Sequence, residues 1–501
     1  MVNSSVFTPK ISNISLFDLD RTAARSCVNG QWVESPNKKT FQNINPANNT
    51  VITEVADIPA EVVEEAIKAA ENAFESFSES PVLERSLMLK TWAELVRKNC
   101  DDLSKVMTWE NGKTLADSKQ EIEFSASFLD WYAGEALRIH GDVTHSGVAS
   151  NHRIFNVKQP IGVCGLITPW NFPAAMIARK AGAAIAAGCT AVIRAAEVTP
   201  LTAIGMIKLA QQAGIPKGVL NLILDSNAKV CGEVITNSPI VRKVSFTGST
   251  NVGKQLMSQS SCTVKKMSLE LGGNAPFIVF PDADLEKTIK SLMACKFNSN
   301  GQVCVCANRI YVHEDIYDTF ANALADLVCE MKIGSGFDPE VKLGPLIAAS
   351  GAEKVEEHVK DAVANGAKIL TGGKRPEGFN ECYYEPTVLV NVKEKCRLFR
   401  EETFGPLAAL IKFKDVDEVI KSANSSSVGL AGYVYTNDLN TMFRMAKGLE
   451  VGIVGANTEQ VNDPFLDFGG IKESGYGKEG GMHGVDEFLI EKAISLQIFP
   501  H

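Results

Sequence analysis

Strand-length apolar runs alternate with helix-length stretches between residues 161 and 260, which narrows the fold to the α/β classes. The expected strands are Ile161–Thr168, Thr190–Ala195, Val219–Leu224 and Lys243–Gly248. The stretches between them have the spacing of helices, and a further helix is expected from Ser249. This order predicts a parallel sheet with helices on its faces.

A second series of the same kind runs from about residue 284 to residue 457 and indicates a second α/β domain. Its predicted strands lie near Arg309–His313, Ala409–Lys414 and Ala431–Thr436. The last apolar alternation, Ile490–Phe499, is predicted to be an isolated strand. Such a strand needs a partner, so a contact between subunits is expected there.

Before these series, residues 60–77 place apolar side chains on one helical stripe. Asp57 and Pro59 precede the stripe, where a cap and a first turn belong. We therefore expect Asp57 to cap this helix.

Charge and cysteine content exclude several classes of function. Lys and Arg number 50 and Asp and Glu 59, so the net charge is −9, which argues against nucleic-acid or anionic-membrane partners. No apolar run is long enough to span a membrane, and the N-terminus lacks a signal-peptide pattern. The 12 cysteines include no CxxC pair, and the seven histidines do not cluster with them. We expect a reduced cytoplasmic enzyme without a metal site.

Two side chains have the chemistry of a nucleophile and a base. Cys304 lies in GQVCVCANR, on a turn before a predicted strand, although a buried structural cysteine is the commoner role. Glu270 lies between Leu269 and Leu271, where an apolar setting would raise its pKa and make it a general base. The alternative for Glu270 is a partly exposed residue at a strand end.

Two further motifs lie where a predicted strand is followed by a helix, and a third has the form of a nucleotide-binding loop. Asn171 in TPWNFP is either an oxyanion donor or a helix cap. Gly248 and Ser249 in FTGSTNVG would turn backbone N–H groups toward a pyrophosphate. The literal GxGxxG of residues 475–480 follows no clear strand and is interpreted as a flexible loop unrelated to nucleotide binding.

These motifs together resemble the NAD(P)-dependent aldehyde dehydrogenase superfamily over nearly the whole chain. TPWNFP, FTGSTNVG, LELGGN, GQVC, EETFGP and FGGIKESGYGKEG occur in the family order, and the 34-residue step from Glu270 to Cys304 also matches. GGNAPFIVF and GQVCVCANR are most similar to the succinate-semialdehyde dehydrogenase branch.

The resemblance implies an α/β, aldehyde dehydrogenase-like fold with three parts. Residues 20–144 and 161–273 would form a Rossmann-type NAD-binding domain, and residues 274–471 the α/β catalytic domain. Residues 145–160 and 485–501 would form a small β oligomerisation arm. A homodimer or homotetramer is expected.

The resemblance also implies a covalent mechanism for oxidising an aldehyde. Cys304 would attack the aldehyde to give a thiohemiacetal, while Asn171 and the Cys304 N–H hold the oxyanion. Hydride would pass to the nicotinamide and leave a thioester, which water activated by Glu270 would hydrolyse.

Cofactor residues follow from the same resemblance. They are Thr168, Trp170, Arg194, Glu197, Gly248, Ser249, Glu402 and Phe404, with Lys180 matching a lysine near the active site. A carboxylate at Glu197 would bind a ribose hydroxyl and repel a 2′-phosphate, whereas Arg194 could pair with that phosphate. We predict NAD, with NADP as the alternative.

The substrate is predicted less narrowly. Arg179 matches one carboxylate-binding arginine of the succinate-semialdehyde branch, but Asn298 stands where the branch has a second. The loop Val461–Asp467 adds two acids that would repel a carboxylate. Succinate semialdehyde and a neutral or aromatic aldehyde therefore both stay open.

Two other hypotheses concern the cysteines. In this branch a second cysteine can oxidise with the nucleophile, which makes Cys306 a candidate redox switch, with a structural thiol as the alternative. Cys304 would also suffice for a cysteine-dependent esterase or acyl-transfer enzyme without redox turnover. An inactive binding protein on the same fold is a third functional class.

Overall fold

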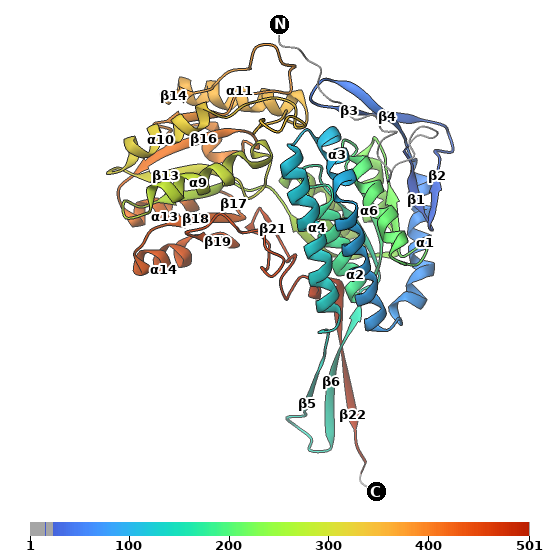
Figure 1. Ribbon diagram of the computed structural model, residues 1–501. Helices are drawn as coiled ribbons and strands as arrows, with labels where there is room; N and C mark the ends of the chain where they lie inside the picture. Colours follow the sequence, from blue (N-terminus) through green and yellow to red (C-terminus); the bar gives the residue numbers. More distant parts are fainter. Residues whose placement is uncertain (1–15, 17–23, 500–501) are drawn as a thin grey trace.

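The computed structural model describes residue 16 and residues 24–499. Residues 20–23 and 500–501, at the edges of two predicted domains, lie outside the described residues. Two large sheets, each with its own helices, lie on opposite sides of the molecule, and a narrow three-stranded arm projects away from them (Figure 1).

The first sheet has a parallel centre with antiparallel edges. In spatial order its strands are β2 (Gln31–Val33), β1 (Ser26–Val28), β9 (Leu220–Ile223), β8 (Thr190–Arg194), β7 (Val163–Ile167), β10 (Val241–Thr247), β11 (Lys266–Glu270) and β21 (Gly475–Tyr476). The four strands predicted between residues 161 and 248 are confirmed, because β9, β8, β7 and β10 lie side by side in this order, pair in parallel and are largely buried.

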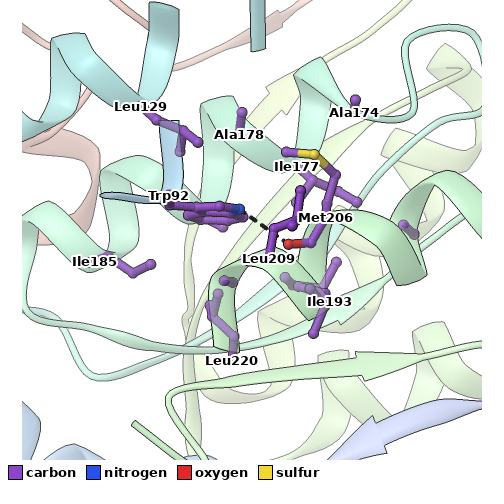
Figure 2. Close-up of a cluster of buried hydrophobic side chains, with 14 of the residues drawn as sticks. Trp92, Leu129, Ala174, Ile177, Ala178, Ile185, Ile193, Met206, Leu209 and Leu220 are labelled. Carbon is purple, nitrogen blue, oxygen red and sulfur yellow. Dashed lines mark hydrogen bonds between the residues drawn. The ribbon is translucent and has the colours of Figure 1, made fainter. Parts of the chain in front are cut away.

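Helices cover this sheet on both faces. They are α1 (Ala60–Ser78), α2 (Val82–Lys98), α3 (Cys100–Asn111), α4 (Leu115–Ala136), α5 (Ala175–Ala187), α6 (Pro200–Gln212), α7 (Ala228–Asn237) and α8 (Thr250–Ser260). Figure 2 shows part of the core, where Trp92 lies among aliphatic side chains and its Nε1 donates to the Met206 carbonyl at 3.1 Å. The small residues of α5 allow close packing, since a Cβ on Gly182 would lie 2.8 Å from the Tyr132 ring.

The start of α1 differs from the prediction. The helix begins at Ala60 after Pro59, and no side chain caps it. Asp57 instead accepts hydrogen bonds from the Ser226 N–H and hydroxyl, both at 2.8 Å. The predicted cap was wrong because this carboxylate ties two loops of the sheet together.

The second sheet confirms the second α/β series. Its spatial order is β14 (Lys368–Thr371), β15 (Thr387–Val390), β16 (Leu407–Phe413), β13 (Ala307–His313), β12 (Ala275–Val279), β18 (Ala431–Tyr435) and β19 (Ile453–Ala456). Its helices are α9 (Leu285–Phe297), α10 (Tyr317–Cys329), α11 (Ala349–Ala364), α12 (Arg397–Arg400), α13 (Val416–Asn424) and α14 (Leu439–Gly448).

The arm contains the predicted C-terminal strand. All nine residues of β22 (Leu489–Gln497) pair antiparallel with β6 (His152–Pro160), which also pairs with β5 (Asp142–His145). The strand is therefore not isolated, and its partner lies in the same chain. Apolar side chains of the arm remain exposed, including Val143, Ile494 and Leu496.

Smaller elements complete the described chain. They are the hairpin β3 (Thr40–Asn45) and β4 (Thr50–Ala56), the pair β17 (Val428–Gly429) and β20 (Ile471–Lys472), and the 3₁₀ turns η2 (Ser261–Thr263), η3 (Asn298–Gly301) and η4 (Asp486–Phe488). Among the described residues, no helix is both long and apolar enough to cross a bilayer, and no group of three metal-binding side chains is found.

The GxGxxG segment is an ordered part of the first sheet, so its interpretation as a flexible loop was wrong. Strand β21 pairs with the end of β11, with Gly475 opposite Glu270. Gly475 has φ +107°, and a Cβ there would lie 1.9 Å from the Leu269 carbonyl oxygen. Glycine is needed here because the segment packs directly on the strand that carries Glu270.

Candidate active site

A cavity of about 600 Å³ has walls from both sheet systems. Most of the predicted site residues line it, namely Asn171, Trp170, Arg179, Glu197, Gly248, Ser249, Glu270, Cys304, Glu402 and Phe404. Thr168, Arg194, Asn298 and Cys306 are not part of its wall. The structure thus collects into one cavity residues that are spread over more than 230 positions of the sequence.

Cys304 lies on a tight turn between η3 and β13. Ser299 and Asn300 have φ values of 47° and 59°, and Gly301 follows with φ +72°. On the other side a Cβ at Gly273 would lie 2.3 Å from the Cys304 carbonyl oxygen. The second glycine of LELGGN therefore lets the backbone pack against the turn that holds the thiol.

The environment of the Cys304 thiol disfavours its ionised form. Burial raises its pKa to about 12, and the nearby carboxylates of Glu402 and Glu270 add to the rise, while Arg179 opposes it. A thiol with such a pKa attacks a carbonyl only when a base removes its proton. The candidate base must therefore lie in the same cavity.

Glu270 ends β11 and is 3% exposed. Neither carboxyl oxygen has a hydrogen-bond partner within the described chain. Burial and the neighbouring Glu479 hold the pKa of this carboxyl well above its usual range, against the opposing charges of Arg179 and Lys180. A buried carboxyl with both oxygens free is suited to exchange protons with a ligand or a water molecule.

Glu479, which the sequence analysis did not identify, links the cations beside Glu270. It ion-pairs with Lys180 and lies 3.2 Å from Nε of Arg179, and Lys180 also donates to the Ser245 hydroxyl at 3.1 Å. Burial raises the pKa of Glu479, but the two cations outweigh it and lower the pKa. The signal in the sequence was an acid inside a glycine-rich family motif, the same motif that was interpreted as a flexible loop.

Asn171 lies next to the nucleophile turn. Its Nδ2 donates to the Gln302 carbonyl at 2.9 Å, which leaves the second N–H of the amide for another acceptor. The alternative role as a helix cap is wrong, because Glu121 accepts from the N–H groups of Ala174 and Ala175 at the start of α5. Lys113 fixes the Asn171 backbone by donating to its carbonyl at 2.7 Å.

Glu402 and two aromatic residues form the opposite part of the wall. The Glu402 carboxylate accepts from the Gly273 N–H at 3.2 Å, and burial raises its pKa to about 7. A Cβ on Gly272 would lie 3.0 Å from Glu402 Oε2. Phe404 has φ 56° and meets the Trp170 ring edge-on at 5.6 Å between centroids.

The turn before α8 needs one correction. Gly248 and Ser249 line the cavity, and Ser249 caps α8 through its side chain. The Gly248 N–H, however, donates to the Glu270 carbonyl at 3.0 Å and is not free for a phosphate. A Cβ on Gly248 would lie 2.4 Å from the Phe246 ring, so this glycine is required by packing.

Arg194, at the end of β8, does not face the cavity as an open cation. Its guanidinium is held by Asp225 and Glu197, each at 2.8 Å, and only Glu197 lines the cavity. Thr168 is buried, and its N–H donates to the Arg194 carbonyl at 3.0 Å. Both residues thus lie behind the wall.

At the substrate end Arg179 is 2% exposed and lies 4.2 Å from the centroid of the Phe468 ring. Its Nη2 is buried without a hydrogen-bond partner among the described residues. The two acids of the loop Val461–Asp467 do not line the cavity, so the expected repulsion is not supported; the loop contributes Asn462 instead. Asp463 accepts from the Phe465 N–H within its own turn, and Asp467 accepts from the N–H of His483, 16 residues further along the chain.

Cys306 lies on the inner side of the nucleophile turn. Its sulfur is 3.2 Å from Nζ of Lys296, and both residues are buried. The Cys306 N–H donates to the Val303 carbonyl at 3.0 Å. A disulfide with Cys304 would have to replace the Lys296 contact, and the redox switch stays a prediction.

The comparisons with known proteins agree on one family. Residues 32–494 match the model of the aldehyde dehydrogenase family. A succinate-semialdehyde dehydrogenase (NADP(+)) 2 of Schizosaccharomyces pombe is 52% identical over 98% of this chain and 99% of its own. A glutarate-semialdehyde dehydrogenase of Pseudomonas putida is 47% identical over 97% of this chain and all of its own.

Solved structures agree with these relatives. The crystal structure of a succinate-semialdehyde dehydrogenase from Burkholderia pseudomallei has a TM-score of 0.95 at 45% identity, and the match covers 98% of this chain and 100% of that one. A match of this extent shows both the fold and the family. The chain is therefore a member of the aldehyde dehydrogenase family, an oxidoreductase that acts on aldehydes.

Proposed function

We propose that this enzyme oxidises an aldehyde to a carboxylic acid through a covalent intermediate on Cys304, with a nicotinamide dinucleotide in the same cavity. The observation that carries the proposal is the buried Glu270 carboxyl, whose two free oxygens share a cavity with the thiol and the Asn171 amide. The test is to mix the enzyme with an aldehyde and the dinucleotide and to measure the formation of reduced nicotinamide by its absorbance.

Three side chains act in this mechanism, and Glu270 acts twice. Glu270, when ionised, takes the proton of the Cys304 thiol, and the sulfur attacks the aldehyde carbon. The free N–H of Asn171 and the backbone N–H of Cys304 donate to the oxyanion of the thiohemiacetal. A nicotinamide bound in this cavity would supply the acceptor for the hydride that leaves the aldehyde carbon. Glu270 releases the thiol proton to solvent and, ionised again, removes a proton from the water that hydrolyses the Cys304 thioester, and the sulfur leaves as the thiolate.

The cavity wall is compatible with a dinucleotide. Gly272 leaves room for the Glu402 carboxylate, since a Cβ at position 272 would lie 3.0 Å from it. Trp170 and Phe404 provide flat apolar surfaces. Glu402 and Phe404 would hold the nicotinamide ribose, with Ser249 at the pyrophosphate and Glu197 at the adenosine ribose. NAD(P) is the cofactor class that also appears in the names of relatives.

We extend the proposal to the parts of the chain. Residues 20–144 with 161–273 would bind the cofactor, and residues 274–471 would carry the nucleophile. The arm, residues 145–160 and 485–501, would join subunits of a homodimer or homotetramer, which its exposed apolar side chains support. The cytoplasmic location stays a prediction.

Replacing Asn171 by aspartate is expected to lower kcat by about 10²–10³-fold, because the size is kept while the oxyanion donor is lost. The melting temperature and the dissociation constant of the dinucleotide report whether the cavity is intact. A loss confined to KM would contradict the oxyanion role, since a donor that acts in the transition state affects kcat.

We propose succinate semialdehyde, or a similar short semialdehyde, as the substrate. The support is the buried Nη2 of Arg179, which has no partner among the described residues, and the names of the relatives. A carboxylate on this guanidinium would form a charge-assisted hydrogen bond. The two acids that had favoured a neutral aldehyde lie off the cavity wall.

Replacing Arg179 by glutamine is expected to raise KM for succinate semialdehyde by about 10- to 100-fold, the effect of losing a hydrogen bond to a charged group. Butanal, a neutral aldehyde of the same length, is the matched substrate and its KM should change little. Equal losses with both aldehydes would mean that Arg179 acts only through Glu479. Better turnover of butanal than of succinate semialdehyde by the unmodified enzyme would reject the semialdehyde assignment.

A further inference from the structure

Lys113, between α3 and α4, and Glu121 of α4 form a buried ion pair. Nζ of Lys113 lies 2.6 Å from Glu121 Oε2, and the two side chains are 1% and 0% exposed. Burial of two charges costs hydration that their attraction only partly offsets, so such a pair adds little net stability to a fold. The other contacts of the two groups indicate a different role for the pair.

Further hydrogen bonds from both charged groups go to the segment that leads into α5. Nζ of Lys113 donates to the Asn171 carbonyl at 2.7 Å. Glu121 Oε1 accepts from the Ala174 N–H at 2.9 Å and from the Ala175 N–H at 3.3 Å. The buried cation thus holds an acceptor of this segment, and the buried anion holds two of its donors.

The segment that carries Asn171 has no regular secondary structure of its own. Residues 168–174 lie between β7 and α5 and include two prolines, which have no N–H to donate. The carbonyl of Trp170 is held by Nδ2 of Asn111, the last residue of α3, at 2.9 Å. The place of the Asn171 amide therefore depends on side chains from α3, α4 and the turn between them.

The nucleophile turn contacts the same part of the molecule. Burial raises the pKa of Asp117, in the first turn of α4, and both Lys113 and a backbone hydrogen bond from Ser299 oppose the rise. Ser299 belongs to the turn that precedes Cys304. The start of α4 thus supports the turn of Cys304, while Lys113, just before this helix, supports the loop of Asn171.

We propose that the Lys113–Glu121 pair positions the oxyanion site: it holds the Asn171 backbone so that the free amide N–H and the Cys304 N–H point to the same oxygen. Neither residue of the pair lines the cavity, so both are positioning residues that act through Asn171. The proposal rests on the proposed function, in which Asn171 donates to the oxyanion.

The test compares the unmodified full-length enzyme with a neutral-pair variant, Lys113→Met/Glu121→Gln. Changing both residues leaves no unpaired charge in the interior, as a single substitution would. We expect kcat to fall by about 10- to 100-fold, the effect of a reacting group displaced by about 1 Å. KM for the aldehyde should change by less than about threefold, because the oxyanion forms only during the reaction. The melting temperature and the dissociation constant of the dinucleotide report whether the variant is folded.

A second comparison separates positioning from a general loss of structure. Asn171→Ala removes the amide, and the same substitution is made in the neutral-pair variant. If the pair acts through this amide, the combined variant should be no slower than Asn171→Ala alone, within about threefold. A pair that only stabilises the fold would give losses that multiply, or a lower melting temperature with an unchanged kcat.

Lys119→Met/Asp101→Asn is the matched control. This exposed ion pair, 2.8 Å long, joins the same two helices, and its loss should leave kcat unchanged. If Asn171→Ala is slow but the neutral-pair variant keeps the kcat of the unmodified enzyme, or if the two losses multiply, only the positioning role is rejected. If Asn171→Ala itself keeps full kcat, the oxyanion role in the proposed function is rejected, and this proposal with it.

Discussion

Replacing Cys304 by alanine is expected to reduce aldehyde oxidation by a factor on the order of 10⁴–10⁶, the size of the loss when a covalent nucleophile is removed. In the proposed mechanism the sulfur forms both the thiohemiacetal and the thioester, and no other thiol lines the cavity in the described chain. The dissociation constant of the dinucleotide should change little. Single-turnover formation of reduced nicotinamide is the measurement.

The exposed thiol of Cys329, at the end of α10, provides a matched control. Cys329→Ala removes one thiol far along the chain from the nucleophile turn and should retain full turnover. Turnover of the Cys304→Ala enzyme within about tenfold of the unmodified rate would contradict covalent catalysis at this residue, because the remaining groups supply only binding and an oxyanion donor.

Replacing Glu270 by glutamine is expected to lower the steady-state rate by about 10²–10⁴-fold, the usual contribution of a general base. Both steps lose their base, but the Cys304 thiol, with a pKa of about 12, gives its proton to solvent more readily than water does, so thioester hydrolysis should be slowed more than acylation. A burst of reduced nicotinamide equal to the enzyme concentration should therefore precede slow turnover. A steady state slowed without any burst would contradict the division of labour between Cys304 and Glu270.

The pH dependence of turnover tests the role of Glu270 as the base independently. Burial and Glu479 raise the pKa of Glu270 well above the usual carboxyl range, so the ionised base is lost already as the pH falls through that raised value. Steady-state turnover should fall with it. In Glu270→Gln this acidic limb should be absent, and a limb at the usual carboxyl pKa in the unmodified enzyme would contradict the effect of burial.

The strands of the first sheet were predictable because they are buried on both faces and read as continuous apolar runs between turns. The role of Asp57 could not be predicted in this way. Its carboxylate accepts a hydrogen bond from Ser226, 169 residues away, and local spacing cannot show such a contact. Strand β21 was also missed. It has only two residues, one of them Gly475, so it carries no periodic pattern, and it pairs with the end of β11.

In the site, too, local motifs were predictable and contacts between distant residues were not. Residue type and motif spacing singled out Cys304, Glu270 and Asn171, and the structure places all three on one cavity wall. Glu479 was missed because its role comes from Lys180, which is 299 residues away. Arg194 and Glu197 carried opposite implications for the cofactor in the sequence. Asp225, 31 residues from Arg194, accepts a hydrogen bond from the Arg194 guanidinium, a contact that no motif records.

The acyl-enzyme is the most direct test of the central claim. Glu270→Gln enzyme is mixed with succinate semialdehyde and the dinucleotide, quenched in acid during the burst, digested and analysed by mass spectrometry. The account predicts an added acyl group, with the mass of the substrate acid less water, on the peptide that contains Cys304. Full formation of reduced nicotinamide with no acyl group on that peptide, or with the acyl group on another residue, would contradict it.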